Sequence, residues 1–338
     1  MHRENVIDKI RMLLFDCPPE TRASFETNIA DVASDEALID TLHRLAFDLR
    51  ITHPTLSFAL ADESLRLSKS FSYLKGIAES RLVQALFYIA SSNYADANAI
   101  LRECLILFRQ LSNREREAFT LGNIGVVFER QGNFTESLKL HHESLSLCKE
   151  IGDAKGEAYS LINIGIIHQR LANFDDALSF LTEALSKCQS LQDRRGEASA
   201  LVNLGTVYDR LRDKENTLKC YVESERIFNA LGQRAAQSTV LANIGLTLQS
   251  HKDYEQAEHY LLTALSIQEE LNLLSNKAYT FSNLGILYED LGVFEKAVDY
   301  QTQSLTIRQH IGDRWGESLC LLNLGISYLR QYQRKQTA

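Results

Sequence analysis

The chain has 338 residues, 45% of them hydrophobic, and a formal net charge of −8. This acidic balance argues against a nucleic-acid-binding protein, because a surface that binds phosphates needs clustered lysine and arginine. Pro18, Pro19 and Pro54 are the only prolines, which argues against a loop-rich β protein and favours a mostly helical one.

The first residues and the cysteines indicate where the protein works. Residues 1–5 lead into a mixed polar segment without the apolar core of a signal peptide. No run of the sequence approaches the ~18 apolar residues that a membrane helix needs. The six cysteines include no CxxC pair, and most fall inside helical patterns, which indicates a reducing compartment. They are Cys17, Cys104, Cys148, Cys188, Cys220 and Cys320. We expect a cytoplasmic protein that does not bind membranes.

A tripeptide, Asn followed by Ile or Leu and then Gly, occurs six times at intervals of 40 residues. A fixed period of this length indicates a repeat architecture in which each repeat packs on its neighbours. The copies begin at Asn123, Asn163, Asn203, Asn243, Asn283 and Asn323. Weaker copies extend the repeats to 36–75, 76–115, 116–155, 156–195, 196–235, 236–275 and 276–315, followed by a half repeat, 316–338. Residues 1–35 precede the array and are expected to form a helical cap.

Each repeat carries the apolar spacing of two amphipathic helices. In the repeat 156–195, the pattern predicts a first helix at about 157–171, a turn, and a second helix at about 174–190. A glycine inside the first helix costs roughly 1 kcal/mol relative to alanine, so its recurrence implies a close approach of two backbones. We expect it to face a column of small residues on the second helix. These are Ser144, Ala184, Ser224, Ala264 and Ser304.

The repeat 196–235 departs from its neighbours. Lys214 replaces an aromatic residue at the start of the second helix, and Glu225 replaces a leucine further along it. A buried carboxylate is costly unless it is paired. We therefore expect Arg226 or Lys219 to lie beside Glu225, with drift of the repeat sequence or a hinge or docking patch as alternative explanations.

No catalytic or metal-binding motif appears in the sequence. A P-loop, a dinucleotide-binding fingerprint, a GxSxG motif and a Cys–His arrangement are all missing. His141 and His142 are adjacent, and neighbouring residues on a helix point about 100° apart, so they do not form a metal pair. His168 replaces an aromatic residue and is expected to pack in the core. We expect no enzyme, no cofactor and no metal.

The half repeat is apolar nearly all round over residues 316–330, like a first helix without its second helix. A terminal helix of a repeat array normally has a polar outer face. Either the chain is part of a longer protein, or this helix mediates self-association.

The repeats resemble the tetratricopeptide repeat. They share a small residue in the first helix, an aromatic residue three positions later, a turn, an aromatic residue that opens the second helix, and a later Ala or Ser. The period of 40 exceeds the common ~34 residues, and the proline that usually closes the second helix is missing. The longer form is similar to the arrays of LGN/Pins adaptors, kinesin light chains and bacterial regulatory proteins. The resemblance implies an all-α, right-handed superhelical solenoid of antiparallel helix pairs, with the first helices on the concave surface.

The six asparagines of the tripeptide are the leading candidates for contact with a ligand, and we call them the asparagine column. Asparagine is a middling helix former, so helix propensity does not explain six copies in phase. Its amide both donates and accepts hydrogen bonds, as pairing with the backbone of an extended peptide requires. The resemblance implies the same use, because asparagines at this position often bind ligand backbone in tetratricopeptide-repeat proteins. Alternatively, they bond neighbouring helices and set the superhelix.

A second column lies seven residues later on the same helix face. Its members are Arg130, Arg170, Arg210, Ser250, Asp290 and Arg330. The three consecutive arginines predict a ligand with acidic groups toward the N-terminal half of the column. Alternatively, the arginines pair with nearby carboxylates such as Glu129 or Asp209.

These observations favour a protein–protein interaction scaffold that holds a partner peptide or protein segment in its concave groove. The alternative is the sensory or regulatory array of a larger bacterial signalling protein, with an output domain outside this chain.

Overall fold

The computed structural model describes residues 2–14, 19, 22–23 and 34–337, and these residues form sixteen α-helices and no strand. The chain divides into an N-terminal part, Met1–Ile167, and a C-terminal part, His168–Ala338. Cys17 and most of residues 15–33 of the expected cap lie outside the described residues.

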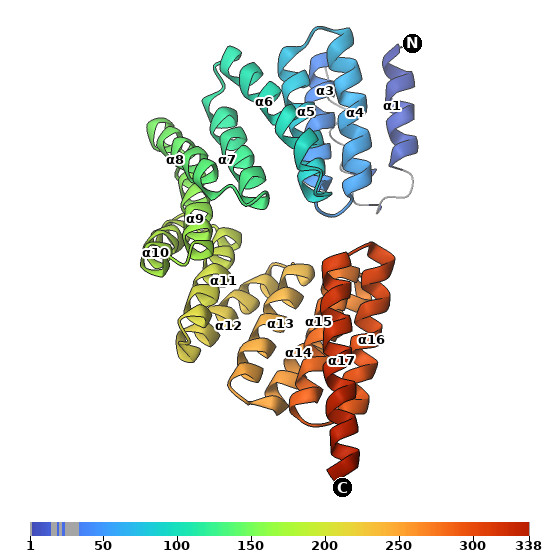
Figure 1. Ribbon diagram of the computed structural model, residues 1–338. Helices are drawn as coiled ribbons and strands as arrows, with labels where there is room; N and C mark the ends of the chain where they lie inside the picture. The colour runs from blue at the N-terminus through green and yellow to red at the C-terminus, as the bar shows by residue number, and fades with distance from the viewer. Residues whose placement is uncertain (1, 15–18, 20–21, 24–33, 338) are drawn as a thin grey trace. The chain divides into compact units, whose positions relative to one another are not determined.

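The helices follow one another in antiparallel pairs (Figure 1). The N-terminal part contains α1 (His2–Leu13), α3 (Asp35–Leu49), α4 (Pro54–Ser70), α5 (Leu74–Ala90), α6 (Tyr94–Gln110), α7 (Arg114–Arg130), α8 (Phe134–Ile151) and most of α9 (Ala154–Arg170). The C-terminal part contains α10 (Phe174–Ser190), α11 (Arg194–Arg210), α12 (Lys214–Ala230), α13 (Arg234–Ser250), α14 (Tyr254–Glu270), α15 (Leu274–Asp290), α16 (Phe294–Ile311) and α17 (Arg314–Thr337). The odd-numbered helices from α3 onward are the first helices of the pairs. The predicted helices 157–171 and 174–190 correspond to α9, which begins three residues earlier, and to α10.

The turns between helices share one backbone motif. Each helix from α4 to α16 is followed by a residue with positive φ, and these residues recur every 20 positions from Ser72 to Gly312. After α7, Gly132 N–H donates to Glu129 O at 3.0 Å and Asn133 N–H donates to Phe128 O at 2.9 Å. Such a left-handed closure satisfies the last carbonyls of a helix. It therefore ends each helix without the proline that the common repeat uses.

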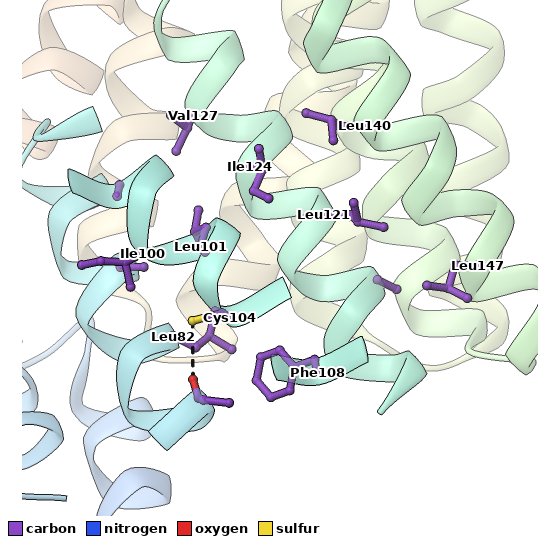
Figure 2. Packing of buried hydrophobic residues seen from close by; sticks show 14 of the residues in the cluster. Leu82, Ile100, Leu101, Cys104, Phe108, Leu121, Ile124, Val127, Leu140 and Leu147 are labelled. Carbon is purple, nitrogen blue, oxygen red and sulfur yellow. Dashed lines mark hydrogen bonds between the residues drawn. The ribbon is translucent and has the colours of Figure 1, made fainter. Parts of the chain in front are cut away.

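The core of each part lies between consecutive helices. In the N-terminal part, Leu101 and Phe108 of α6 pack with Leu82 of α5 and Ile124 of α7, and all four are buried (Figure 2). Cys104 donates to the Ala78 carbonyl at 3.6 Å, and burial raises the pKa of its thiol to about 12. All five described cysteines are buried, as expected for small apolar residues inside helices.

We predicted that the glycine of the first helix faces the column of small residues on the second helix, and this prediction was wrong. A Cβ on Gly125 would lie 2.8 Å from His141 Nε2, and one on Gly245 would lie 2.7 Å from Leu261 Cγ. The glycine therefore makes room for a large side chain of the second helix. The small column packs one to two turns away along the first helix, where Ser144 donates to the Ala118 carbonyl at 2.9 Å.

Glu225 has a different partner from the two that we expected. Its Oε1 accepts a hydrogen bond from Gln237 Nε2 of α13 at 2.6 Å, while Arg226 pairs with Glu223 at 2.8 Å. Glu225 and Lys214 are both half-exposed, so neither buries an uncompensated charge. These two positions tolerate polar residues because solvent still reaches them.

The histidines differ in their surroundings. His141 is fully buried and His142 is exposed. His168 stacks on Phe180 with ring centroids 5.3 Å apart, so it packs as an aromatic residue in its column. No three His, Cys, Asp or Glu side chains of the described residues come together as metal ligands do. None of the helices that the structure describes is long and apolar enough to span a membrane.

Candidate functional site

Each asparagine of the column stands two residues before the helix glycine. In α7, α11, α13 and α15 that glycine faces the second helix, so the asparagine points about 200° away from it. In the N-terminal part, Asn123 of α7 and Asn163 of α9 are half-buried. In the C-terminal part, Asn203, Asn243 and Asn323 are half-buried as well. Asn283 of α15 is 4% exposed, and its amide nitrogen is buried without a hydrogen-bond partner.

Two of the asparagines bond to their own helix. Asn123 Nδ2 donates to Phe119 O and Asn203 Nδ2 donates to Ser199 O, each at 2.8 Å. An amide has two donor hydrogens and an oxygen that accepts two bonds. The intrahelical bond therefore orients the side chain and leaves it able to bond a further group.

Hydrogen bonds between neighbouring first helices run through other residues. In the C-terminal part, Thr247 Oγ1 donates to Asp209 Oδ1 at 3.3 Å, and Gln249 Nε2 donates to Asp290 Oδ2 at 3.0 Å. Asn276 Nδ2 donates to Thr239 Oγ1 at 3.1 Å. In the C-terminal part, these three bonds connect neighbouring first helices. Such connections are the alternative role that the sequence analysis gave to the asparagine column.

Apolar side chains flank the asparagine column, and the sequence analysis missed them. They stand four residues before and three residues after the asparagine, on the same face. Phe119 in the N-terminal part, and Tyr279, Ile286 and Leu319 in the C-terminal part, are exposed. We call these four residues, with the half-buried Val126 and Leu246, the apolar strip. The period of 40 could have revealed it, because the position three after the asparagine is aliphatic in five repeats out of six.

The charged column is uneven. Arg130, Arg170 and Arg210 are exposed at the ends of their helices. Further along, Glu289 accepts from Arg330 at 2.8 Å and from Ser327 Oγ at 3.2 Å. Glu289 is therefore engaged within the protein, and Asp290 is engaged through its bond from Gln249. The carboxylate of Asp209, a suggested partner of an arginine, accepts from Thr247 instead.

The first two repeats lack the asparagine, and a different cluster links them to the third repeat. Arg116 Nε donates to the buried Glu79 at 2.8 Å, and burial raises the pKa of this carboxyl group. The Arg116 guanidinium also lies 5.6 Å from the ring centroid of Phe47 and 5.9 Å from that of Phe119. This cluster joins α3, α5 and α7 beside the first asparagine.

Family models of the tetratricopeptide repeat match more than half of the chain, at residues 116–190, 196–270 and 278–311. No curated protein sequence matches the chain. Matches of a repeat model to helices of this spacing, together with the geometry above, confirm the predicted all-α array of antiparallel helix pairs.

Several solved structures share the fold at low sequence identity. A signal-transduction ATPase with numerous domains and a tetratricopeptide-repeat sensor, from Pyrococcus horikoshii, is 15% identical, with a TM-score of 0.65. That alignment covers 98% of this chain and 52% of the ATPase, so this chain spans about half of its length. A Rap protein complexed with Competence and Sporulation Factor is 12% identical, with a TM-score of 0.65, and covers 98% and 97% of the two chains. NprR in complex with its cognate peptide NprX is 16% identical, with a TM-score of 0.57 over 91% and 87%.

Proposed function

Because this chain belongs to the tetratricopeptide-repeat family, we propose that it is a non-catalytic protein–protein interaction module of the cytoplasm. A peptide segment of the partner binds along the asparagine column of the C-terminal part, on the face of the first helices α11, α13, α15 and α17. The observation that carries the proposal is the combination of oriented amides with the exposed apolar strip on one helix face. Amides pair with peptide backbone, and apolar side chains take up the side chains of the peptide.

Proteins of the same fold support this use of the array. The NprR structure holds its cognate peptide, and the Rap structure holds Competence and Sporulation Factor. The exposed Arg130, Arg170 and Arg210 favour a partner with acidic groups near that end of the column. A rim of arginines adds specificity and speed of association more than affinity.

The experiment starts from a peptide selected on the intact protein from a phage-displayed random library. Changing Asn203, Asn243 and Asn323 of the C-terminal part to Ala should weaken binding of this peptide at least ~10-fold, because each net hydrogen bond contributes about 1 kcal/mol. Binding is measured by calorimetry, and helicity is checked by circular dichroism. Asn229→Ala, an exposed asparagine on the second helix α12, is the matched control. Unchanged affinity of the triple variant would rule out the asparagine column as the site.

A second candidate function is a sensory array within a larger signalling protein, with its output domain elsewhere. The repeat sensor of the Pyrococcus horikoshii ATPase supports this reading, since this chain aligns with about half of that protein. A stop codon directly after Ala338 in the open reading frame would exclude an output domain that follows this residue.

The helix α17 supports a further association. Its exposed apolar residues cover much of residues 316–330, and an apolar patch of this kind on an otherwise acidic protein is typical of an interaction surface. We propose that the chain self-associates through this helix.

A further inference from the structure

The open face of α17 is the face that a second helix covers elsewhere in the array. Leu321 is 56% exposed, whereas Leu241 at the same position of α13 is 5% exposed. Tyr328 is 55% exposed, whereas Tyr288 of α15 is 4% exposed. A Cβ built on Gly325 meets nothing within 4 Å. The recess over this glycine, which a large side chain fills in the earlier pairs, is therefore open.

The second helices fill that recess with a fixed set of side chains. Each set begins with the residue that opens the helix, which is aromatic except at Lys214. A small residue stands three positions later, a large residue seven positions later and a second small residue ten positions later. The sets are Phe134, Ser137, His141 and Ser144 in α8; Phe174, Ala177, Leu181 and Ala184 in α10; Lys214, Thr217, Tyr221 and Ser224 in α12; Tyr254, Ala257, Leu261 and Ala264 in α14; and Phe294, Ala297, Gln301 and Ser304 in α16. The last three members of every set are buried.

The helix α17 carries the same set itself. Trp315, Ser318, Leu322 and Gly325 stand at the same spacing of three, seven and ten residues. The first helices α7 to α15 have no aromatic residue where α17 has Trp315. They have Glu115, Lys155, Arg195, Ala235 and Ser275. Trp315 is 75% exposed, and Leu322 is exposed as well. The helix α17 thus combines the recess of a first helix with the side chains of a second helix.

The contacts within a pair make this combination self-complementary. In α7 and α8, Ser137 Oγ donates to the Gly125 carbonyl at 2.7 Å, and Ser144 Oγ donates to the Ala118 carbonyl at 2.9 Å. When α17 takes both roles, the first contact becomes Ser318 of one copy on Gly325 of the other. The second contact places Gly325 of the first copy on Ser318 of the other copy. This is the same pair of residues as in the first contact, with the two copies exchanged. Two α17 helices packed in this way are related by a two-fold axis, as in most homodimers.

We propose that two copies of the chain associate through α17, each helix acting as first and second helix of the same pair. Leu322 of each copy fills the recess over Gly325 of the other, and Trp315 of each copy lies beside Tyr328 of the other. The Ser318 hydroxyl, which donates to the Arg314 carbonyl of its own helix at 3.0 Å, turns to the Gly325 carbonyl of the other copy. This inference rests on the proposed self-association of residues 316–330 and specifies its geometry.

Light scattering of the intact chain tests the pairing. We expect twice the monomer mass of 38.3 kDa at micromolar concentration. Gly325→Ala should raise the dissociation constant of the dimer at least ~10-fold, because the added methyl group occupies the space of Leu322 from the other copy. The substitution is harmless to the single chain, since nothing lies within 4 Å of the new Cβ. Leu262→Ala, at an exposed leucine of the second helix α14, should leave the dimer intact.

A disulfide trap fixes the direction of the pairing. A variant with Trp315→Cys and Tyr328→Cys should form a covalent dimer under mild oxidation. Within one helix the two positions are about 20 Å apart, too far for an internal disulfide. A monomer at all concentrations, or a dimer that Gly325→Ala does not weaken, overturns the inference. Neither result bears on the peptide-binding proposal, because binding of the selected peptide is measured in a separate experiment. The asparagine variants should still dimerise.

Discussion

His141 is a polar residue in a column that holds leucine at Leu101, Leu181 and Leu261. Its imidazole is fully buried against Gly125, and neither ring nitrogen has a hydrogen-bond partner. Burial lowers its pKa from 6.5 to about 4, and the neighbouring His142 contributes in the same direction. The folded protein therefore holds this side chain neutral.

The lowered pKa predicts a loss of stability at acidic pH. Unfolded chains bind the proton at about pH 6.5 and the folded chain only at about pH 4. The penalty is absent above pH 6.5, grows as the pH falls through this window, and reaches about 2 kcal/mol at pH 5. The wild type should therefore unfold at a lower urea concentration at pH 5 than at pH 7. His141→Leu should make this difference smaller, because it removes the penalty that comes from the buried imidazole. Leucine fits the recess, as Leu261 shows opposite Gly245.

The neighbouring histidine provides the control for this experiment. His142 is exposed and only adds to the shift that burial of His141 causes, so His142→Leu should reduce the pH dependence of the urea midpoint much less than His141→Leu. Part of the dependence should remain in His141→Leu, because burial also lowers the pKa of His43 to about 4. An equal pH dependence in the His141 variant and in the wild type would show that the buried imidazole does not drive acid destabilisation.

At the scale of the helix pair, the recess over the glycine decides how closely two helices approach. A Cβ on Gly245 would lie 2.7 Å from Leu261 Cγ and 3.2 Å from the Ala257 carbonyl oxygen. The backbone oxygen cannot move aside as a flexible side chain can. Gly325 occupies the same position in α17 but has open space around it.

This contrast predicts opposite effects of one substitution. Gly245→Ala should lower the free energy of unfolding by about 1–3 kcal/mol, because the methyl group overpacks the pair. Gly325→Ala should raise it by up to about 1 kcal/mol through helix propensity. Urea unfolding at a protein concentration too low for α17 to pair between copies measures both. Equal effects at the two positions would contradict the role of the recess.

The helices were largely predictable from the sequence, whereas their side-chain contacts were not. The apolar period placed α10 correctly and α9 within three residues, because a repeated pattern averages out local exceptions. The partner of the glycine was predicted wrongly, since the offset between two antiparallel helices depends on the turn that joins them. The partner of Glu225 was missed for a related reason: Gln237 comes from the following pair, and no local spacing connects the two residues.

At the scale of the whole molecule, the candidate site was predicted in part. The sequence revealed the asparagine column, because one residue type recurs at one position. The apolar strip beside it mixes Phe, Tyr, Leu, Ile and Val. Its aliphatic position recurs every 40 residues, but core positions recur in the same way, and exposure in the folded state is what separates the strip from the core. The lateral bonds through Asp209 and Asp290 likewise depend on how consecutive pairs stack.

The distribution of charge leads to a prediction about the partner. The chain has a net charge of −8, which repels an acidic ligand at long range. Attraction must therefore come from groups in direct contact with the ligand, such as the exposed Arg210, because charges are screened beyond about 10 Å at 0.1 M salt. If acidic groups of the ligand contact this arginine, Arg210→Gln should weaken an acidic selected peptide several-fold. It should leave a version of that peptide with Gln and Asn in place of Glu and Asp unaffected.

Calorimetry of both peptides with both proteins gives the coupling between the arginine and the acidic groups. The coupling should shrink as salt is added, since an exposed ion pair is screened. Arg226→Gln is the matched control, because Arg226 lies on the second helix α12 and already pairs with Glu223 at 2.8 Å. A coupling near zero at low salt would mean that the arginine column does not contact the acidic groups. The apolar strip and the asparagine column would then set the specificity of the groove without it.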